Sequence, residues 1–121
     1  MAMSDEKHVV VGILGGGQLG RMLCQASHSI GITCAVLDPA GEKCSAAHVA
    51  HIVKAGDFKN EKDIEAFVDE VKPHVLTVEI EHVNVDVLFE LREKKGKKRF
   101  IFVFSIFYFS HFMFMLYIFL V

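Results

Sequence analysis

Residues 11–23 read VGILGGGQLGRML, and they carry the clearest structural signal in the chain. Residues 8–14 form a short, β-branched apolar run that ends in glycines, as a buried parallel strand does. From residue 18 to residue 30 the spacing becomes helical, with one apolar face made of Leu19, Met22, Leu23, Ala26 and Ile30. We therefore expect a strand, a glycine loop and a helix in direct succession.

The same alternation continues to about residue 95. Asn60 is the expected helix cap, with Asp63 in a capping-box-like position, and Gly31 is the expected C-cap glycine of the first helix. Alternating strands and helices imply right-handed crossovers, so we predict an α/β fold with a parallel half-sheet of about four strands and flanking helices. Beyond the first strand and helix, strands are expected at 33–37, 49–54 and 74–78, helices at 61–72 and 85–95, and a loop with about one helical turn at 40–48.

Composition narrows the class of protein. The formal net charge of −2 gives no argument for nucleic acid as a partner. Cys24, Cys34 and Cys44 match no metal-ligand spacing, which favours reduced, buried thiols and predicts no metal site. Residues 1–7 are short and charged, with no secretory or import pattern, so we expect a cytoplasmic protein.

Residues 100–121 differ from the rest of the chain. They contain no Asp, Glu, Lys or Arg and hold 8 of the chain's 11 Phe residues. We therefore divide the chain into a domain at 1–98 and an apolar tail at 99–121. Three interpretations of the tail compete: translation of an intron or a shifted frame, a membrane anchor long enough to cross a bilayer, and a soluble β-prone segment.

The loop at residues 15–20 fits the pattern G-x-G-x-x-G directly after a strand and before a helix. Glycines let the backbone turn tightly and approach a ligand, and the unpaired N–H groups of a helix start favour anions. Arg21, in the first helical turn, adds positive charge. We predict a phosphate-binding loop; the alternative is a tight structural turn. The candidate residues are Gly15, Gly16, Gly17, Gln18, Leu19, Gly20 and Arg21.

Two other strand ends carry acidic residues. Asp38 ends the second strand, where a dinucleotide-binding fold places an acid on the ribose, so an NAD-type module is an alternative interpretation. Glu79 and Glu81 follow the fourth strand on one face, with His82 beyond them. These groups suit amines, hydroxyls or a metal, and the alternatives are a turn at Asp38 and a solvated strand exit at Glu79.

Four blocks together resemble a known family. VGILGGGQLGRML at 11–23, VLDP at 36–39, GDF at 56–58 and LTVEIEHV at 76–83 occur in the order and spacing of N5-carboxyaminoimidazole ribonucleotide synthetase, and equally of the matching domain of phosphoribosylaminoimidazole carboxylase. The resemblance covers residue 8 to about residue 95. It implies a Rossmann-like, pre-ATP-grasp domain from purine biosynthesis.

The resemblance also implies an activity. Such enzymes, ligases or lyases by class, use ATP, Mg²⁺ and bicarbonate to carboxylate the amine of 5-aminoimidazole ribonucleotide, and are often homodimers. The backbone at Gly17, Gln18 and Leu19 would hold the 5′-phosphate, with Glu79 and Glu81 near the ribose or imidazole. The ATP-grasp module has no counterpart here, so we expect no catalytic residue, no bound ATP and no activity from this chain alone. A membrane partner follows only if the tail is an anchor.

Overall fold

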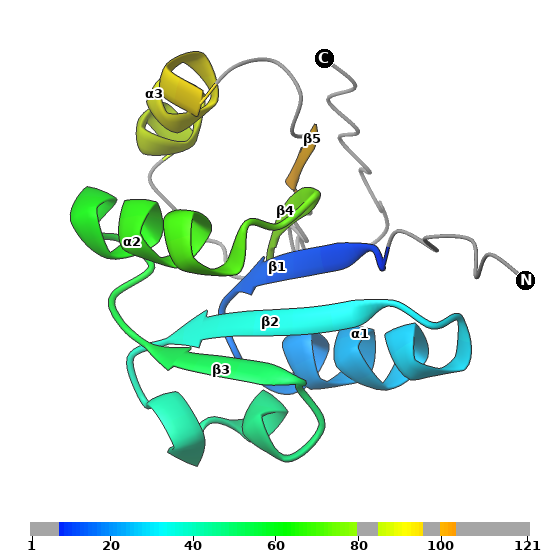
Figure 1. Cartoon of the computed structure of the whole chain (residues 1–121). Helices are drawn as coiled ribbons and strands as arrows, with labels where there is room; N and C mark the ends of the chain where they lie inside the picture. The colour runs from blue at the N-terminus through cyan, green and yellow to red at the C-terminus, as the bar shows by residue number, and fades with distance from the viewer. Residues whose placement is uncertain (1–7, 80–84, 96–99, 104–121) are drawn as a thin grey trace, which may run out of the picture.

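The computed structural model describes residues 8–79, 85–95 and 100–103, and it forms an α/β structure with helices on both faces of one sheet (Figure 1). The strands are β1 (Val10–Leu14), β2 (Thr33–Asp38), β3 (Ile52–Ala55), β4 (Val75–Val78) and β5 (Phe100–Val103). The helices are α1 (Gln18–Ser29), α2 (Glu61–Val71) and α3 (Val85–Lys95), with two 3₁₀ turns, η1 (Gly41–Lys43) and η2 (Ser45–His48). The predicted fold class is confirmed.

The sheet has the strand order β3-β2-β1-β4-β5, and every described pairing is parallel. In register, Leu14 of β1 lies between Leu37 of β2 and Val78 of β4. Since parallel strands end at the same edge, the residues that follow these three positions come together there. These are the glycine loop, Asp38 and Glu79.

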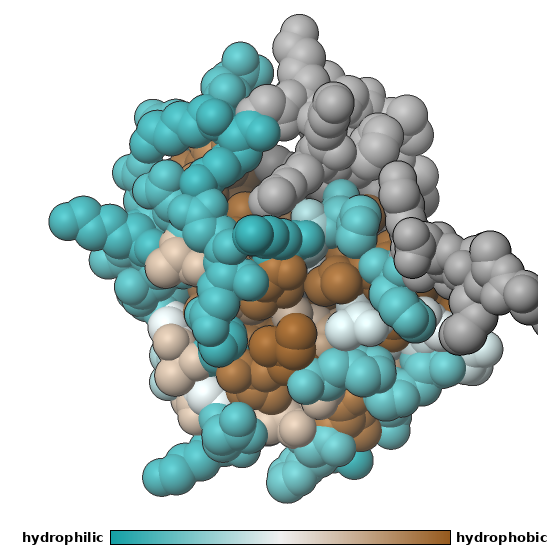
Figure 2. Space-filling model, in the orientation of Figure 1, coloured by the Kyte–Doolittle hydropathy of each residue, from teal (hydrophilic) through white to brown (hydrophobic). Residues whose placement is uncertain are grey.

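Two core layers lie on the two faces of the sheet. The layer under α2 and α3 is built from large side chains, among them Leu37, Ile64, Phe67 and Leu88. The layer under α1 and η2 is built from smaller ones, with Cys24, Cys34, Cys44 and Ala46 around Ile13 and Val36. The three cysteines are free and buried, as predicted. Viewed as in Figure 1, apolar side chains gather in the middle of the molecule and are surrounded by hydrophilic ones (Figure 2).

The face of helix α1 that packs on the sheet is not the apolar face predicted from the spacing of its residues. An apolar stripe ordinarily faces the core, yet the buried residues of α1 are Gly20, Cys24 and Ser27. Small side chains at this i, i+4, i+7 spacing let the helix lie close to the strands. The five apolar residues of the predicted face therefore point outward, and all of them are exposed: Leu19, Met22, Leu23, Ala26 and Ile30.

The ends of the helices follow their capping signals, with one correction. Asn60 Oδ1 accepts hydrogen bonds from the N–H groups of Lys62 and Asp63, so the predicted cap is confirmed. Asp63 does not complete the predicted capping box, because its carboxylate accepts from the N–H of Asp57 at 2.8 Å. Gly31 follows the end of α1 with φ +70°, the left-handed conformation of a C-cap glycine.

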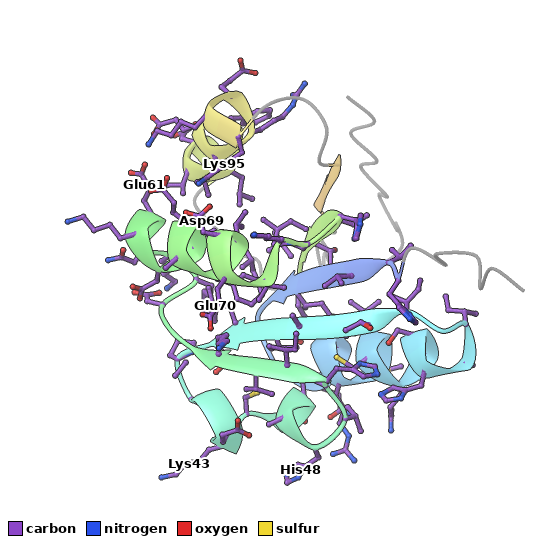
Figure 3. The ribbon with its side chains drawn as sticks, viewed as in Figure 1. Lys43, His48, Glu61, Asp69, Glu70 and Lys95 are labelled. Carbon is purple, nitrogen blue, oxygen red and sulfur yellow. The ribbon has the colours of Figure 1, made fainter. Side chains whose placement is uncertain are left out.

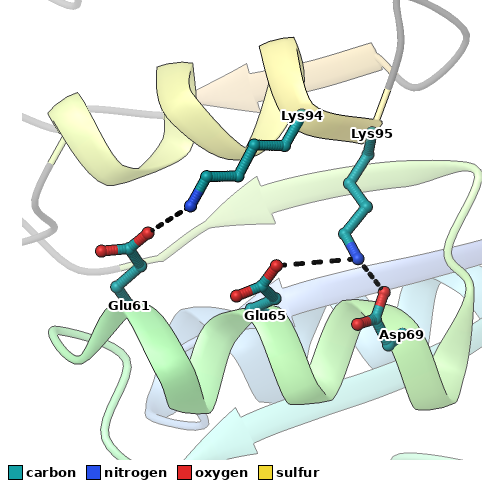
Figure 4. Close-up of polar contacts among 5 residues, drawn as sticks. All are labelled: Glu61, Glu65, Asp69, Lys94 and Lys95. Atoms are coloured by element: carbon teal, nitrogen blue, oxygen red, sulfur yellow. Dashed lines mark hydrogen bonds and ion pairs between the residues drawn. The ribbon is translucent and has the colours of Figure 1, made fainter.

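Helix α3 packs on α2 through buried Leu88 and Leu91, and ion pairs rim the contact. Lys94 Nζ lies 2.8 Å from Glu61 Oε1, and Lys95 pairs with both Glu65 and Asp69 (Figures 3 and 4). The basic end of α3 thus pairs with acidic residues of α2.

Strand β5 lies inside the segment predicted as a tail. Its backbone pairs with β4, with Phe100 opposite Val75, so the sheet gains one strand beyond the predicted four. The rest of the tail lies outside the described residues. Within the parts that are described, each helix is too short or too polar to cross a bilayer.

Candidate functional site

The candidate site lies at the carboxyl edge of the sheet, where α1 begins. Three backbone hydrogen bonds hold the loop between β1 and α1 to its neighbours. Gly15 N–H donates to Leu37 O of β2 at 2.9 Å, Glu79 N–H donates to Leu14 O at 3.0 Å, and Ala46 N–H of η2 donates to Gly16 O at 2.9 Å. Gly15 has φ +105°, which L side chains rarely adopt, so this turn requires glycine.

Glu79 binds the start of α1 directly. One carboxylate oxygen accepts from Gly17 N–H at 2.9 Å, and the other accepts from Leu19 N–H, also at 2.9 Å. A charged acceptor across two unpaired amides is a strong arrangement, because it satisfies the donors and meets the positive end of the helix dipole. In the structure these amides thus hold one anionic group, and that group is the protein's own carboxylate.

Asp38 holds the other side of the loop. Its Oδ2 accepts from Gly16 N–H at 2.9 Å and its Oδ1 accepts from Ala40 N–H at 2.8 Å. Both oxygens are thus engaged in fixing the backbone between β1 and the turn after β2. This agrees with the interpretation of Asp38 as a turn residue, and it weakens the argument for a ribose contact of the dinucleotide type.

Two glycines are required by close contacts rather than by backbone angles. A Cβ at Gly17 would lie 2.8 Å from Glu79 Oε1, and one at Gly20 would lie 2.6 Å from the carbonyl oxygen of Gly15. A side chain at Gly17 would therefore push the carboxylate away. At Gly20 it would push the helix away from the loop that precedes it.

The remaining predicted residues divide into two groups. Gln18 lies beside η2, where its Oε1 accepts from Ser45 Oγ at 3.5 Å. Arg21 is half-buried and closes the first turn of α1, with its N–H donating to Gly17 O at 2.9 Å. Glu81 and His82 lie outside the described residues. The structure thus brings the whole loop, Asp38 and Glu79 together.

Sequence reasoning missed the contribution of η2. Cys44 is 6% exposed and packs under the loop, so that a Cβ at Gly16 would lie 2.5 Å from its sulfur. Three histidines lie away from the loop: His28 stacks on His51 at 4.4 Å between ring centroids, and His74 Nδ1 accepts from Val10 N–H at 3.0 Å. No group of three or more potential metal ligands occurs among the described residues.

Fold and site together define a class: a parallel α/β domain whose glycine loop, at the carboxyl edge of the sheet, offers helix-start amides to an anion. Within that class the sequence is specific. The profile described as "Ribonucleotide synthetase preATP-grasp domain" matches residues 8–100, and the chain belongs to this family.

Curated relatives agree with this assignment. The chain is 50% identical over 88 residues to a chloroplastic phosphoribosylaminoimidazole carboxylase of Vigna aconitifolia, a match that covers 73% of this chain and 15% of the relative. It is 39% identical over 84 residues to an N5-carboxyaminoimidazole ribonucleotide synthase of Staphylococcus aureus, covering 69% of this chain and 22% of the relative. The match therefore spans only 15% and 22% of the length of these two relatives.

Solved structures show the same domain inside longer chains. The N5-carboxyaminoimidazole synthetase of Staphylococcus aureus, in complex with ADP, matches with a TM-score of 0.64 and 36% identity, over 71% of this chain and 22% of that one. The Aspergillus clavatus synthase in complex with ADP and 5-aminoimidazole ribonucleotide matches with a TM-score of 0.56 and 34% identity, over 78% and 23%. The predicted family is confirmed, and the comparisons do not favour the NAD alternative.

Proposed function

We propose that this chain is the ribonucleotide-binding part of an enzyme that carboxylates 5-aminoimidazole ribonucleotide with ATP and bicarbonate. The observation that carries the proposal is the Glu79 carboxylate seated across the amides of Gly17 and Leu19. It marks the start of α1 as a place where an anion is held by backbone donors. A ribonucleotide offers such an anion in its 5′-phosphate. It also has hydroxyl groups that can donate hydrogen bonds to a displaced carboxylate.

Glu79 gives the proposal a definite form. A phosphate that takes the amides of Gly17 and Leu19 must displace the carboxylate, because two anions would otherwise compete for the same donors. The freed Glu79 then accepts hydrogen bonds from the ribose or from the amine. Inorganic phosphate gains only the first interaction, whereas the whole ribonucleotide gains both.

The substitution Glu79→Gln separates the two interactions. With the competing charge removed, the affinity for inorganic phosphate should rise. The affinity for 5-aminoimidazole ribonucleotide should fall about tenfold or more, because hydrogen bonds to charged groups are worth about 1.5–3 kcal/mol. Isothermal titration calorimetry on the full chain measures both constants. Glu70→Gln, on the exposed carboxylate that pairs with Lys54, is the matched control and should change neither.

Two results would contradict the proposal. One is a wild-type chain that binds neither the ribonucleotide nor phosphate. The other is a Glu79→Gln variant that melts like the wild type and binds the ribonucleotide with unchanged affinity. In the second case the carboxylate is only a helix cap.

The carboxylation itself also needs parts of the family enzymes that lie beyond the matched residues 8–100. ATP and Mg²⁺ belong to the longer family members, where ATP activates bicarbonate, and the described residues contribute positioning of the ribonucleotide only. We expect the purified chain to show no ATP-dependent carboxylation above background. Homodimer formation and a cytoplasmic location are likewise proposed for the complete enzyme.

A further inference from the structure

One polar group in the core of the protein has no hydrogen-bond partner. Thr77 of β4 is 4% exposed, and its Oγ1 is the only buried side-chain nitrogen or oxygen in the described part of the chain that makes no hydrogen bond. Buried polar groups are nearly always paired, because an unpaired donor has lost its bonds to water and gained nothing in exchange. A hydroxyl left unpaired in a native core therefore points to a partner that reaches it in another state of the protein.

The strand register places this hydroxyl on the face of the sheet that carries α1. Thr77 lies opposite Ile13 in the parallel ladder, and Ile13 belongs to the core layer under α1 and η2. The strand neighbours of Thr77, Leu76 and Val78, belong to the opposite layer, as alternation along a strand requires. By the same alternation Glu79 follows on the face of Thr77, which agrees with its hydrogen bonds to the start of α1. The hydroxyl and the carboxylate are thus consecutive side chains on one face of the sheet.

The carboxylate can reach the hydroxyl. Glu79 N–H donates to Leu14 O, so the ladder between β1 and β4 continues to this residue and its backbone stays in line with the strand. Residues two apart on an extended strand are separated by about 6.6 Å, a span that a glutamate side chain covers by turning back along the strand. In the structure both carboxylate oxygens are held by the amides of Gly17 and Leu19 instead. The Thr77 hydroxyl is thus a donor that the carboxylate can take once it leaves those amides.

We propose that Thr77 is a positioning residue that receives the Glu79 carboxylate when an anion displaces it from the start of α1. The inference rests on the proposed function, in which a phosphate takes the amides of Gly17 and Leu19. A hydrogen bond from a hydroxyl to a carboxylate is charge-assisted and stronger than one between neutral groups, so it offsets part of what Glu79 loses on leaving. One carboxylate oxygen then accepts from Thr77, and the other accepts from the ribose or the amine of the ribonucleotide.

Two substitutions at Thr77 separate the role of the hydroxyl from that of the methyl group. Thr77→Val removes the hydroxyl and keeps the shape, so the affinity of the full chain for inorganic phosphate and for 5-aminoimidazole ribonucleotide should fall about tenfold or more in calorimetry. Without ligand its melting temperature should stay the same or rise, because an unpaired buried donor is removed. Thr77→Ser keeps the hydroxyl, so its affinities should stay within about twofold of the wild type while it melts at a lower temperature.

Thr33→Val is the matched control. Thr33 begins β2 at the opposite end of the sheet from the site, so loss of its hydroxyl should leave both affinities unchanged. If Thr77 has only a structural role, such as holding a buried water, Thr77→Val should melt at a lower temperature and bind phosphate as the wild type does. That result would overturn the inference. A Thr77→Ser variant that loses as much affinity as Thr77→Val would also overturn it, because the packing of the methyl group would then explain both variants.

Inorganic phosphate distinguishes failure of this inference from failure of the proposed function. Phosphate displaces the carboxylate but offers it neither a ribose nor an amine. A wild-type chain that binds phosphate but not the ribonucleotide contradicts the proposed function, and a lower phosphate affinity of Thr77→Val would still support the role of the hydroxyl. A wild-type chain that binds both ligands, with neither affinity changed in Thr77→Val, contradicts the inference alone.

Discussion

Gly20→Ala is the substitution for which the structure gives the sharpest expectation. Gly20 lies within α1 at a helical position and is buried. By intrinsic propensity alone, alanine in a helix is more stable than glycine by about 0.8–1.0 kcal/mol. In an isolated helix, Gly20→Ala would therefore increase the stability of the helix.

In this protein, packing around Gly20 turns the expected gain in stability into a loss. The new Cβ would lie 2.6 Å from the Gly15 carbonyl oxygen and 3.4 Å from Glu79 Oε2. The first contact has to open by at least 0.4 Å to reach the 3.0 Å below which Cβ atoms are essentially never found. The obstacle is backbone, so α1 must move and the hydrogen bonds to Glu79 must lengthen. Overpacking of this kind costs about 1–3 kcal/mol, and a contact with backbone belongs in the upper part of that range, at about 2–3 kcal/mol. After the gain in propensity, we expect a net loss of about 1–2 kcal/mol.

Urea denaturation followed by circular dichroism measures the change in the free energy of unfolding. In a thermal melt, the same loss corresponds to a fall of about 4–16 °C, at 4–8 °C for each kcal/mol in a domain of this size. Ala26→Gly is the control, because Ala26 is exposed on the same helix and reports propensity alone. A Gly20→Ala protein that is as stable as the wild type or more stable would refute the reasoning.

Three further predictions concern the free energy of unfolding. Leu88→Ala should lower it by about 2–5 kcal/mol, because Leu88 is 2% exposed in the core under α3. Lys95→Ala removes a surface ion pair and should lower it by under about 1 kcal/mol, an effect that denaturation in high salt should abolish. Asn60→Ala should lower the free energy of unfolding by about 1 kcal/mol, because it removes the cap of α2. Lys59→Ala in the same turn is the control and should change it little, and melting curves of the two variants measure the difference. Burial raises the pKa of the Cys44 thiol above its usual value of 9.0, so the native thiol resists ionisation. Its contribution to stability is complete below that value and is lost as the pH rises beyond it, so the free energy of unfolding should fall between pH 8 and pH 10, and fall less in Cys44→Ala.

The positions of the elements could be predicted from the sequence because turn residues bound them. Gly31 and Pro73 separate regular segments, and the expected helices at 18–30, 61–72 and 85–95 agree with α1, α2 and α3 to within one residue at each end. Strand β3 begins later than predicted, at Ile52, because the amides of Val49 and Ala50 bond back to Ala46 and close η2. The pattern of apolar residues carries no sign of that turn.

The buried face of α1 could not be predicted in the same way. Periodicity identifies the apolar side of a helix, but close packing on the sheet is decided by size, and Gly20, Cys24 and Ser27 are the residues small enough for it. The sequence indicates Asp38 and Glu79 as candidate residues at their strand ends, and the structure brings both to the glycine loop. The amides that the Glu79 carboxylate bonds could not be predicted, because a hydrogen bond between groups about 60 residues apart leaves no local pattern in the sequence.

The bond between Glu79 and the glycine loop also sets an order of events in folding. Its two ends are separated by 62 residues, about half of the 121-residue chain. Closing so long a loop is slow compared with forming a helix turn. While the protein is being synthesised, β1 and α1 can therefore be present long before β4 delivers the carboxylate that fixes the start of the helix. A nascent chain that ends before Glu79 therefore has the complete loop sequence but lacks the two hydrogen bonds that hold the start of α1.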